Sequence, residues 1–298
     1  MDTKDLWMLL SGVGDDIEGV IQSAPPELRK ELENANIILI EKVTTIIGSD
    51  GKLELFYNGK KLEPPRFFWP AMTNTDSYSF ENILIEAGAE CILNLNDVAA
   101  AHSKAISYER LASHGIRVPR SLIFYDRTDK TTITDTFTYP FVVKPDTGTG
   151  GAGVALIHND EEMDAYLNEL TPGMTYIAQE YIASSKGRDL RVVMLGGQCL
   201  FSMQRTAGNE KEFRSNVHAG GSAKAVEIDD ATLALCRKIG NLYDLDLIGI
   251  DLLYGEDGFV VTEVNNFPGI RREFLPHLKP AGLHVLKTFI DRKNSEKA

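Results

Sequence analysis

The chain has 298 residues, of which 43% are hydrophobic and 25% are charged, a composition typical of a folded globular protein. A chain of this length can bury a sizeable core, and it predicts two or three domains. The formal net charge of −12 disfavours nucleic acid as a general partner, although local basic residues can still bind phosphates. No apolar run approaches the length of a membrane span, so we expect no membrane partner.

The cysteines and the N-terminal residues indicate where the protein works. Cys91, Cys199 and Cys236 are scattered and lack metal-ligand spacing, which is typical of a reducing compartment. The first residues have an acidic flank and no small-residue cleavage site, unlike a secretory signal. We therefore expect a cytoplasmic protein, and the sequence leaves homo-oligomerisation open.

Residues 1–96 alternate strand-like runs with helical patterns, which predicts a small α/β domain. The strand-like runs cover residues 6–10, 37–40 and 92–95, and the helical patterns cover residues 26–35 and 79–90. Turn signals at Asp50-Gly51 and Asn58-Gly59 predict short strands before, between and after these two turns.

Two further units follow, over residues 97–182 and 183–298. The first opens with a predicted helix that Asn96 or Asp97 caps and Gly115 ends. It continues through a strand over residues 121–125 into the glycine-rich sequence YPFVVKPDTGTGGAGVALIHN, residues 139–159. The last unit is predicted to be mostly strands, with one helix over residues 229–245.

Gly148, Gly150 and Gly153 spell G-x-G-x-x-G directly after a strand-like run, as in dinucleotide-binding Rossmann units. That fold needs a helix directly after the glycines, because the helix N-terminus holds the pyrophosphate. Here the glycines lead into the apolar run 154–157, and a helical pattern begins only at Asp160. No Gly-Lys-Ser/Thr closes the loop, which also excludes a Walker A loop. The pattern therefore predicts a strand, glycine loop, strand hairpin.

Lys144 ends the apolar strand just before the glycine loop. A lysine there can reach phosphates while the backbone N–H groups of the loop cradle them. The alternative is a solvated lysine at a strand end beside a flexible hairpin, so its role depends on the other residues of the site.

The sequence IGIDLLYGEDGFVVTEVNN, residues 248–266, supplies a candidate metal site. A three-residue loop with Gly258 in the left-handed conformation would pair Asp251 with Glu263 and place Asn265 on the same face. Facing carboxylates repel in a half-buried setting unless a cation sits between them. Such oxygen ligands suit Mg²⁺, which takes few protein ligands plus substrate phosphates. An exposed acidic hairpin is the alternative, and the apolar neighbours count against it.

Two polar segments complete the candidate site. Residues 176–197 read as strand, turn, strand, and their backbone and carboxylate groups could contact a base and ribose hydroxyls. Residues 203–223 are too polar and glycine-rich for a core, and Arg205 and Arg214 there can clamp phosphoryl oxygens. The alternatives are an ordinary edge strand with Glu180 in it and a mobile surface loop. His218 taken alone is a loop residue rather than a catalytic base.

Together the motifs VVKPDTGTGGAGV, QEYI, KGRDLR, EFRSNVHAGGSA, GIDLL and TEVNNFPG resemble, in order and spacing, the ATP-grasp superfamily and specifically its RimK-like carboxylate–amine ligases. The resemblance runs from about Asn94 to Gly269. It implies an α/β (α+β) ATP-grasp fold, with a pre-ATP-grasp domain over residues 1–96 and two α+β lobes, 97–182 and 183–298, sandwiching ATP. The glycine hairpin would then be the flap over the ATP phosphates.

The resemblance also implies a role for each candidate residue. Lys104, Lys144 and the flap glycines Gly148, Gly150 and Gly151 would bind the phosphates. The adenine hinge would be Gln179, Glu180, Tyr181 and Ile182, with Asp189 on the ribose. Arg214, Ser215 and Asn216 would contact nucleotide and phosphates, with Arg205 near the transferred phosphoryl group. Lys144, Arg205 and Arg214 would be catalytic, and Asp251, Glu263 and Asn265 would bind Mg²⁺.

The chemistry implied by the resemblance is amide-bond formation. A substrate carboxylate attacks the γ-phosphorus of ATP, giving an acyl phosphate and ADP, and an amine then displaces phosphate. The cofactors would be ATP and Mg²⁺, as two ions, with Mn²⁺ as a substitute. The substrates would be small-molecule or peptide carboxylates and amines, such as glutamate joined to an amino acid, a peptide or a cofactor tail. Catalysis would rest on positioning and charge neutralisation.

Other functions stay open at this point. An ATP-grasp-type kinase would use the same nucleotide site to phosphorylate a small molecule. A nucleotide-binding regulatory protein would have lost turnover, and the intact set Asp251, Glu263 and Asn265 argues against it. A Rossmann oxidoreductase lacks support, because no helix follows the glycines.

The sequence NNFPGIRREF departs from the family, whose glutamate-adding members carry small residues after the asparagine, so the amine substrate stays open. Adjacent residues on an extended segment point to opposite sides. We therefore expect at most one of Arg271 and Arg272 to grip a substrate carboxylate, with His218 as a further substrate candidate. The alternative is that both arginines are surface charges.

Overall fold

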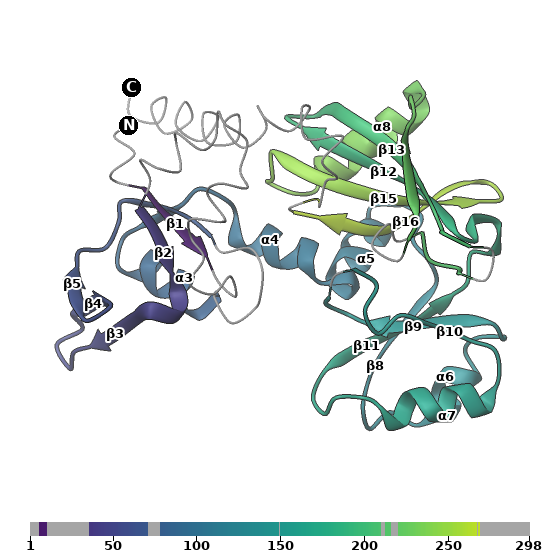
Figure 1. The fold of residues 1–298 in the computed structure, drawn as a ribbon, viewed down its shortest axis with the longest axis horizontal. Helices are drawn as coiled ribbons and strands as arrows, with labels where there is room; N and C mark the ends of the chain where they lie inside the picture. The colour runs from purple at the N-terminus through teal and green to yellow at the C-terminus, as the bar shows by residue number, and fades with distance from the viewer. Residues whose placement is uncertain are drawn as a thin grey trace. The chain divides into compact units, whose positions relative to one another are not determined.

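The computed structural model describes residues 6–10, 36–70, 78–148, 150–209, 212–215, 220–266 and 268. They belong to two compact units (Figure 1), one containing the described residues up to Ala99 and the other running from Ala100 to Pro268. The predicted helix over residues 26–35 lies outside the described residues. No described helix is long and apolar enough to cross a membrane.

The first unit contains a parallel sheet. Its strands, in spatial order, are β2 (Asn36–Leu39), β1 (Leu6–Leu10), β6 (Phe67–Trp69) and β7 (Glu90–Cys91). Trp7 and Leu9 are two residues apart on β1, so both point to the same face of the sheet. There they pack with Phe68 and with Leu84 of helix α3 (Tyr78–Glu86). Burying this apolar face holds the helix on the sheet.

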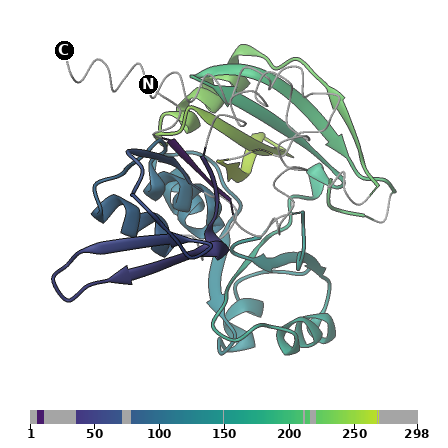
Figure 2. The ribbon, with the colours of Figure 1, turned by 60° about the vertical axis from the view of Figure 1, so that its left-hand side comes forward.

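The first unit also contains a smaller antiparallel sheet, formed by β3 (Val43–Ile47), β4 (Leu53–Tyr57) and β5 (Lys60–Leu62). Figure 2 shows β3 and β4 as an antiparallel arm. Asn58 and Gly59 have φ values of 49° and 75°, and two positive values in succession are what a two-residue hairpin turn requires. The predicted turn here and the strands over 6–10 and 37–40 are confirmed to within one residue.

The predicted strand over residues 92–95 and the predicted single helix after it are both wrong. β7 ends at Cys91, and Leu95 already begins helix α4 (Leu95–His102). The residue that caps α4 is Asn94 rather than Asn96 or Asp97, since its Oδ1 accepts hydrogen bonds from the backbone N–H groups of both. Gly115 does end the helical stretch, as predicted, with a φ of 67°.

The predicted helix is divided at Ser103. There α4 stops, and α5 (Lys104–Ser113) begins with Ser103 in an extended conformation, φ −91° and ψ 120°. The Ser103 side chain accepts a hydrogen bond from Ile106 N, which makes Ser103 the N-cap of a new helix. The apolar periodicity continues through this point, so sequence pattern alone gave no sign of the break.

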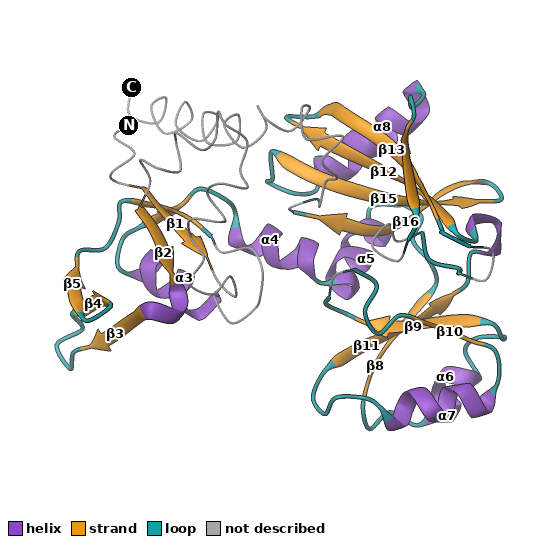
Figure 3. Cartoon of the chain, viewed as in Figure 1, coloured by secondary structure: helices purple, strands orange, loops and turns teal. Residues whose placement is uncertain are grey.

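The second unit contains two antiparallel sheets (Figure 3). The first has the spatial order β10 (Ala155–Ile157), β9 (Phe141–Pro145), β11 (Thr175–Glu180) and β8 (Ser121–Tyr125). Helices α6 (Lys130–Thr134) and α7 (Asp160–Asn168) cover one face, burying Phe124, Phe141 and Met163. Lys144 and Ile177 are register partners, and alternation turns both to the other face.

The glycine-rich sequence forms the predicted hairpin. Strands β9 and β10 pair antiparallel, with Val143 opposite Ala155, and α7 begins only at Asp160. This order confirms that the glycines do not lead into a helix, which excludes the Rossmann turn. Gly148, Gly150, Gly151 and Gly153 all have positive φ values, between 67° and 139°.

The second sheet of this unit has five described strands. In spatial order they are β14 (Ser222–Ala225), β13 (Gln198–Thr206), β12 (Arg188–Leu195), β15 (Leu247–Gly255) and β16 (Gly258–Asn265). A single turn of 3₁₀ helix, η4 (Ala183–Ser185), leads from β11 into β12. Helix α8 (Asp230–Gly240) packs against β12, and α5 packs against β16. Helix α5 therefore contacts the edge strand that carries Glu263.

Two glycines of the flap make a matched stability test. Gly150 and Gly153 have φ values of 67° and 70°, but only at Gly153 would a Cβ atom meet another group, 2.9 Å from Pro145 Cγ. We expect Gly150→Ala to cost about 1 kcal/mol through backbone strain alone. Gly153→Ala should cost at least about 1 kcal/mol more, because the proline ring ends β9 and cannot move away easily. Urea unfolding of both variants measures the difference, and equal costs would contradict the packing at Pro145.

Candidate functional site

The β15–β16 hairpin pairs Asp251 with Glu263, as predicted, but not through the predicted loop. Gly255 pairs with Gly258, so the turn has two central residues instead of three. A register shift between Asp251 and Leu252 restores the pairing: Leu252 lies opposite Val261 and Asp251 opposite Glu263. Thr262 is thus the extra residue of a β-bulge, which bends strands and re-aims side chains near functional sites.

Asp251 is buried and is held by two arginines. Arg191 of β12 donates from Nε to Oδ1 at 2.6 Å and from Nη2 to Oδ2 at 2.7 Å, a bidentate pair. Arg205 of β13 donates from Nη2 to Oδ2 at 2.8 Å. Burial alone would raise the pKa of Asp251, but the two guanidinium groups reverse this and hold it well below its usual range. Asp251 is therefore a fixed negative charge.

Asp189, the predicted ribose contact, lies next to this cluster. It is buried on β12 directly opposite Arg205, whose Nε donates to its Oδ1 at 2.7 Å and whose Nη2 donates to its Oδ2. Asp189, Arg205, Asp251 and Arg191 thus form alternating charges across three neighbouring strands. The guanidinium of Arg205 bridges two carboxylates in this arrangement.

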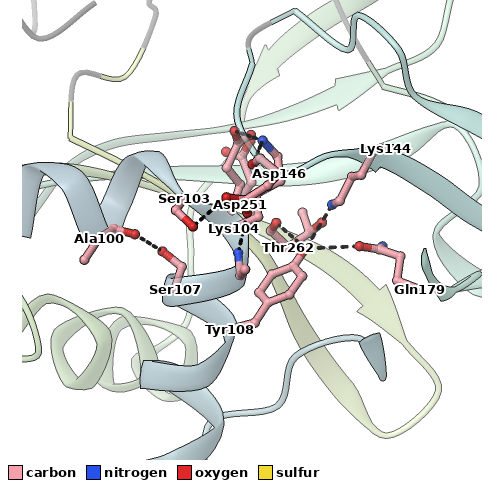
Figure 4. A network of polar contacts seen from close by, with 12 residues as sticks. Ala100, Ser103, Lys104, Ser107, Tyr108, Lys144, Asp146, Gln179, Asp251 and Thr262 are labelled. Carbon is pink, nitrogen blue, oxygen red and sulfur yellow. Dashed lines mark hydrogen bonds and ion pairs between the residues drawn. The ribbon is translucent and has the colours of Figure 1, made fainter. Parts of the chain in front are cut away.

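Lys144 is buried, and its ammonium contacts a tyrosine (Figure 4). Lys144 Nζ donates to the Tyr108 hydroxyl at 2.9 Å, the one hydrogen bond found for it within the described part of the chain. The same hydroxyl lies 2.8 Å from Thr262 O and 3.1 Å from Gln179 Oε1. Burial lowers the pKa of Lys144 to about 8, and Glu263 and Asp146 oppose this only in part. A buried ammonium with a single hydrogen bond is costly, and binding an anion would reduce that cost.

Lys104 is the first residue of α5 and contacts Glu263. Its Nζ lies 3.7 Å from Glu263 Oε1 and donates to Asp146 O at 3.1 Å. The Asp146 carboxylate caps the same helix, accepting from Ser103 Oγ at 2.8 Å and from Ala105 N at 2.7 Å. Figure 4 shows this junction at the start of the helix. The segment after Lys144 thus fixes the helix that carries Lys104.

Arg214 contacts the glycine flap. Its Nη1 donates to Gly151 O at 3.1 Å, while its Nε and Nη2 bind the Glu212 carboxylate at 2.9 and 2.8 Å. Ser215 follows it and is half-buried. The guanidinium is therefore partly neutralised by Glu212, and an incoming phosphate would compete with that carboxylate.

The predicted adenine hinge lies where β11 ends. Gln179 is buried, and Glu180 Oε1 accepts from Arg120 N at 2.9 Å. The Tyr181 hydroxyl is buried and has no hydrogen-bond partner among the described residues. Ile182 precedes the 3₁₀ turn and completes the segment. Asn216, His218, Arg271 and Arg272 lie outside the described residues.

Three residues of the site were not predicted from the sequence. Arg191 stands two residues after Asp189, and strand alternation from that position would have indicated it. Tyr108 stands four residues after Lys104 on α5, which places both on one helix face. Asp146 gave no sequence signal, because a side chain beside a glycine loop carries no mark of the helix it will cap.

The donor set fits Mg²⁺. Asp251 and Glu263 would supply carboxylates, and Asn265, two residues further along β16, would supply its side-chain oxygen, since an amide nitrogen is a donor and does not bind a cation. Among the described residues, Asp251 Oδ1 accepts one hydrogen bond, and a carboxylate oxygen with one bond keeps acceptor capacity. Within the described ranges no group of three or more His, Cys, Asp or Glu side chains is arranged to hold a metal ion. A site of this type would be completed by substrate phosphates.

The arrangement of the two sheets, the glycine hairpin and the two lysines, Lys104 and Lys144, can be compared with solved structures. D-alanine–D-alanine ligase from Bacillus anthracis in complex with ATP shares the fold with a TM-score of 0.67 at 17% identity, covering 98% of this chain and 99% of that chain. The ATP-grasp ligase PsnB, complexed with a precursor variant, Mg and ADP, has a TM-score of 0.60 at 17% identity, covering 95% and 98%. The chain has the ATP-grasp fold.

The family follows from the sequence. The profile described as RimK-like ATP-grasp domain matches residues 101–274, more than half of the chain, so the chain belongs to the RimK-like ATP-grasp family. This confirms the resemblance seen in the motifs. A probable alpha-L-glutamate ligase of Rhodopirellula baltica is 29% identical over 74% of this chain and 56% of its own length. The ribosomal protein bS6–L-glutamate ligase of Escherichia fergusonii is 34% identical over 58% of each. The chain thus spans less than two thirds of these relatives.

The depressed pKa of Lys144 predicts how ATP affinity depends on pH. Phosphates favour the charged lysine, which is already formed below pH 8, so affinity should be flat there. Above about pH 8 the lysine must take up a proton on binding, and affinity should fall roughly tenfold per pH unit. Calorimetry from pH 7 to 9.5 tests this. Lys144→Arg should remove the fall, whereas Lys130→Arg, at a surface pair with Asp164, should keep it. A flat parent profile would contradict the assignment.

Removing the Glu263 carboxylate should separate metal binding from nucleotide binding. Glu263→Gln should abolish most of the increase in ATP affinity that Mg²⁺ produces, by at least about tenfold. ATP without metal should bind no more weakly than to the parent, because a negative charge near the phosphates is gone. Titrations with and without Mg²⁺ measure both. Glu256→Gln, in the exposed turn of the same hairpin, is the matched control. An unchanged Mg²⁺ effect in Glu263→Gln would place the ligands elsewhere.

Proposed function

We propose that the chain is an ATP-dependent carboxylate–amine ligase that forms an amide bond through an acyl phosphate and releases ADP and phosphate. The observation that carries this proposal is the Lys104–Glu263 contact beside the paired residues Asp251 and Glu263, with Lys144 close by. This arrangement brings cations for phosphates and oxygen ligands for a divalent ion into one site. Membership of the RimK-like family supports it.

The two lysines and the flap would bind the triphosphate. Lys144 brings a buried ammonium with a single hydrogen bond among the described residues, and a phosphate oxygen would supply the missing partners. Lys104 would exchange part of its contact with Glu263 for a phosphate oxygen. The positive φ values of Gly148, Gly150 and Gly151 let backbone N–H groups turn toward one side, the geometry of an anion-binding loop. The hinge at residues 179–182 would hold the base.

The first step transfers the γ-phosphoryl group to a carboxylate. A carboxylate oxygen forms a bond to the γ-phosphorus as the bond to the ADP oxygen breaks. In the second step the amine nitrogen bonds to the acyl carbon, the bond to phosphate oxygen breaks, and the amine loses a proton. Lys104, Lys144, Arg205 and Arg214 would neutralise charge that develops on phosphoryl oxygens. No side chain needs to form a covalent intermediate.

Asp251, Glu263 and Asn265 would hold Mg²⁺, with two ions and Mn²⁺ as a substitute as the finer expectation. When bound, the metal neutralises phosphate charge and orients the triphosphate. Arg191 and Arg205 fix the Asp251 carboxylate, so this ligand needs little reorganisation on binding.

The relatives support an acidic amino acid as one substrate. Two of them are named as ligases of L-glutamate, one acting on a ribosomal protein. By analogy, this chain would join a glutamate-like amino acid, through its amine, to the carboxylate of an amino acid, a peptide or a cofactor tail. Arg271, Arg272 and His218 remain the proposed contacts for such an anionic substrate.

An ADP-release assay with hydroxylamine tests the reaction class. ADP release should require a carboxylate substrate, and hydroxylamine should trap the acyl phosphate as a hydroxamate, detected as its iron complex. A screen over free amino acids and peptides with C-terminal glutamate should identify the carboxylate. Glu256→Gln should behave as the parent, whereas Glu263→Gln should release no ADP. A stable product phosphorylated on a hydroxyl group, without any amide, would establish the kinase alternative instead.

A further inference from the structure

We propose that Tyr108 is the positioning residue of Lys144: its hydroxyl fixes the lysine ammonium and ties it to β16, the strand that carries Glu263. The proposal rests on the proposed function in that Lys144 is taken to bind ATP phosphates. It adds a residue that the family motifs do not contain, on a helix outside the flap, the hinge and the acidic hairpin.

The geometry around Tyr108 joins both sheets of the second unit. Tyr108 is 5% exposed, and its hydroxyl accepts from Lys144 Nζ of β9 at 2.9 Å. A tyrosine hydroxyl has one hydrogen to donate. Thr262 O of β16, at 2.8 Å, is nearer than Gln179 Oε1 of β11, at 3.1 Å. One hydroxyl therefore receives from the four-stranded sheet and donates to the five-stranded sheet (Figure 4).

The acceptor at β16 is the bulge residue. Thr262 is the extra residue that brings Glu263 opposite Asp251, so its carbonyl falls out of the regular ladder pairing with β15. The Tyr108 hydroxyl supplies a hydrogen bond to this carbonyl. Tyr108 thereby stabilises the bulge and the lysine position through the same oxygen.

The charged groups around Lys144 explain why the Tyr108 hydroxyl affects the lysine ammonium. Glu263 faces it from β16 and Asp146 from the end of β9, and both favour the ammonium, while burial opposes it more strongly. Lys104 lies on α5 with Tyr108. Burial raises the pKa of Tyr108, so the hydroxyl stays neutral and keeps its hydrogen for Thr262. Without this hydroxyl, Lys144 would lose its one hydrogen-bond partner among the described residues.

The test compares Tyr108→Phe with Tyr243→Phe. Both tyrosines are 5% exposed and each hydroxyl makes a buried hydrogen bond that joins α5 to another part of the unit, since Tyr243 donates to Ser107 Oγ of α5 at 3.1 Å. Tyr108 contacts a lysine ammonium, whereas the contacts described for Tyr243 are with Ser107 Oγ and with the Arg110 guanidinium over its ring. We expect Tyr108→Phe to weaken ATP binding about ten- to a hundredfold, the range for a hydrogen bond to a charged group. Tyr243→Phe should change it less than about twofold.

Two readouts separate positioning from simple structural support. In Tyr108→Phe, the pH above which ATP affinity falls should move below that of the parent, since the charged lysine has lost a partner. In a Lys144→Met background, Tyr108→Phe should have no further effect on ATP affinity, because the group it positions is absent. The KM for the carboxylate substrate should not change. Melting temperatures identify any loss of fold, and a destabilised variant is assayed below its melting temperature, where the double-mutant comparison still applies.

The outcomes are distinct. If the unsubstituted protein binds ATP and the Tyr108→Phe variant binds it equally well, the positioning role is overturned and the proposed function stays intact. Equal effects of Tyr108→Phe in the Lys144→Met and parent backgrounds also overturn it. A parent that fails to bind ATP overturns both proposals. Weakened binding that disappears in the Lys144→Met background, together with the shifted pH profile, supports the positioning role.

Discussion

The carboxylate of Asp146 binds the N-terminus of α5, and the candidate site depends on this contact. It caps the helix through Ser103 Oγ and Ala105 N, directly after the strand that ends with Lys144. The helix therefore begins at Lys104 and not upstream, which turns Lys104 and Tyr108, one turn apart, toward the sheets. The same few residues of chain thus locate both lysines. A helix continuing through Ser103 would rotate these side chains away.

Most buried charged side chains of the site have a partner of opposite charge. Burying a charge costs several kcal/mol unless it is paired and hydrogen-bonded. Asp251 is paired with Arg191 and Arg205, and Lys104 lies near Glu263. Lys144 is the exception, since the one hydrogen bond found for it among the described residues is donated to the neutral Tyr108 hydroxyl. The imbalance favours an anion at Lys144, whereas the Asp251 cluster is already close to neutral. In the proposed function, a polyphosphate would therefore be attracted to the side of the site where Lys144 and the glycine flap lie.

Local patterns foretold much of the fold and part of the site. The glycine hairpin follows from the apolar run after the glycines. The C-terminal end of α5 follows from Gly115, and β8 follows from the apolar strand pattern. What could not be read from the sequence depends on contacts distant along the chain. The helix break at Ser103 needs Asp146, forty-three residues away, and the partner of Lys144 comes from a tyrosine at an ordinary helical position. The predicted pairing of Asp251 with Glu263 is confirmed, but the predicted cause is wrong. A two-residue turn with a bulge produces this pairing, and not a three-residue turn.

The bulge at Thr262 has a consequence for how this hairpin tolerates insertions and deletions. Two solutions place Asp251 opposite Glu263: a two-residue turn with one bulged residue, or a three-residue turn with regular pairing. Both use the same number of residues between the two carboxylates. A single residue can also be removed or added without separating the pair. Removing the bulged residue leaves a two-residue turn with regular pairing, and adding one residue gives a three-residue turn that keeps the bulge. The pairing of the two carboxylates is therefore fixed more strictly than the length of the segment between them, and related chains should differ there in turn length and in the presence of the bulge.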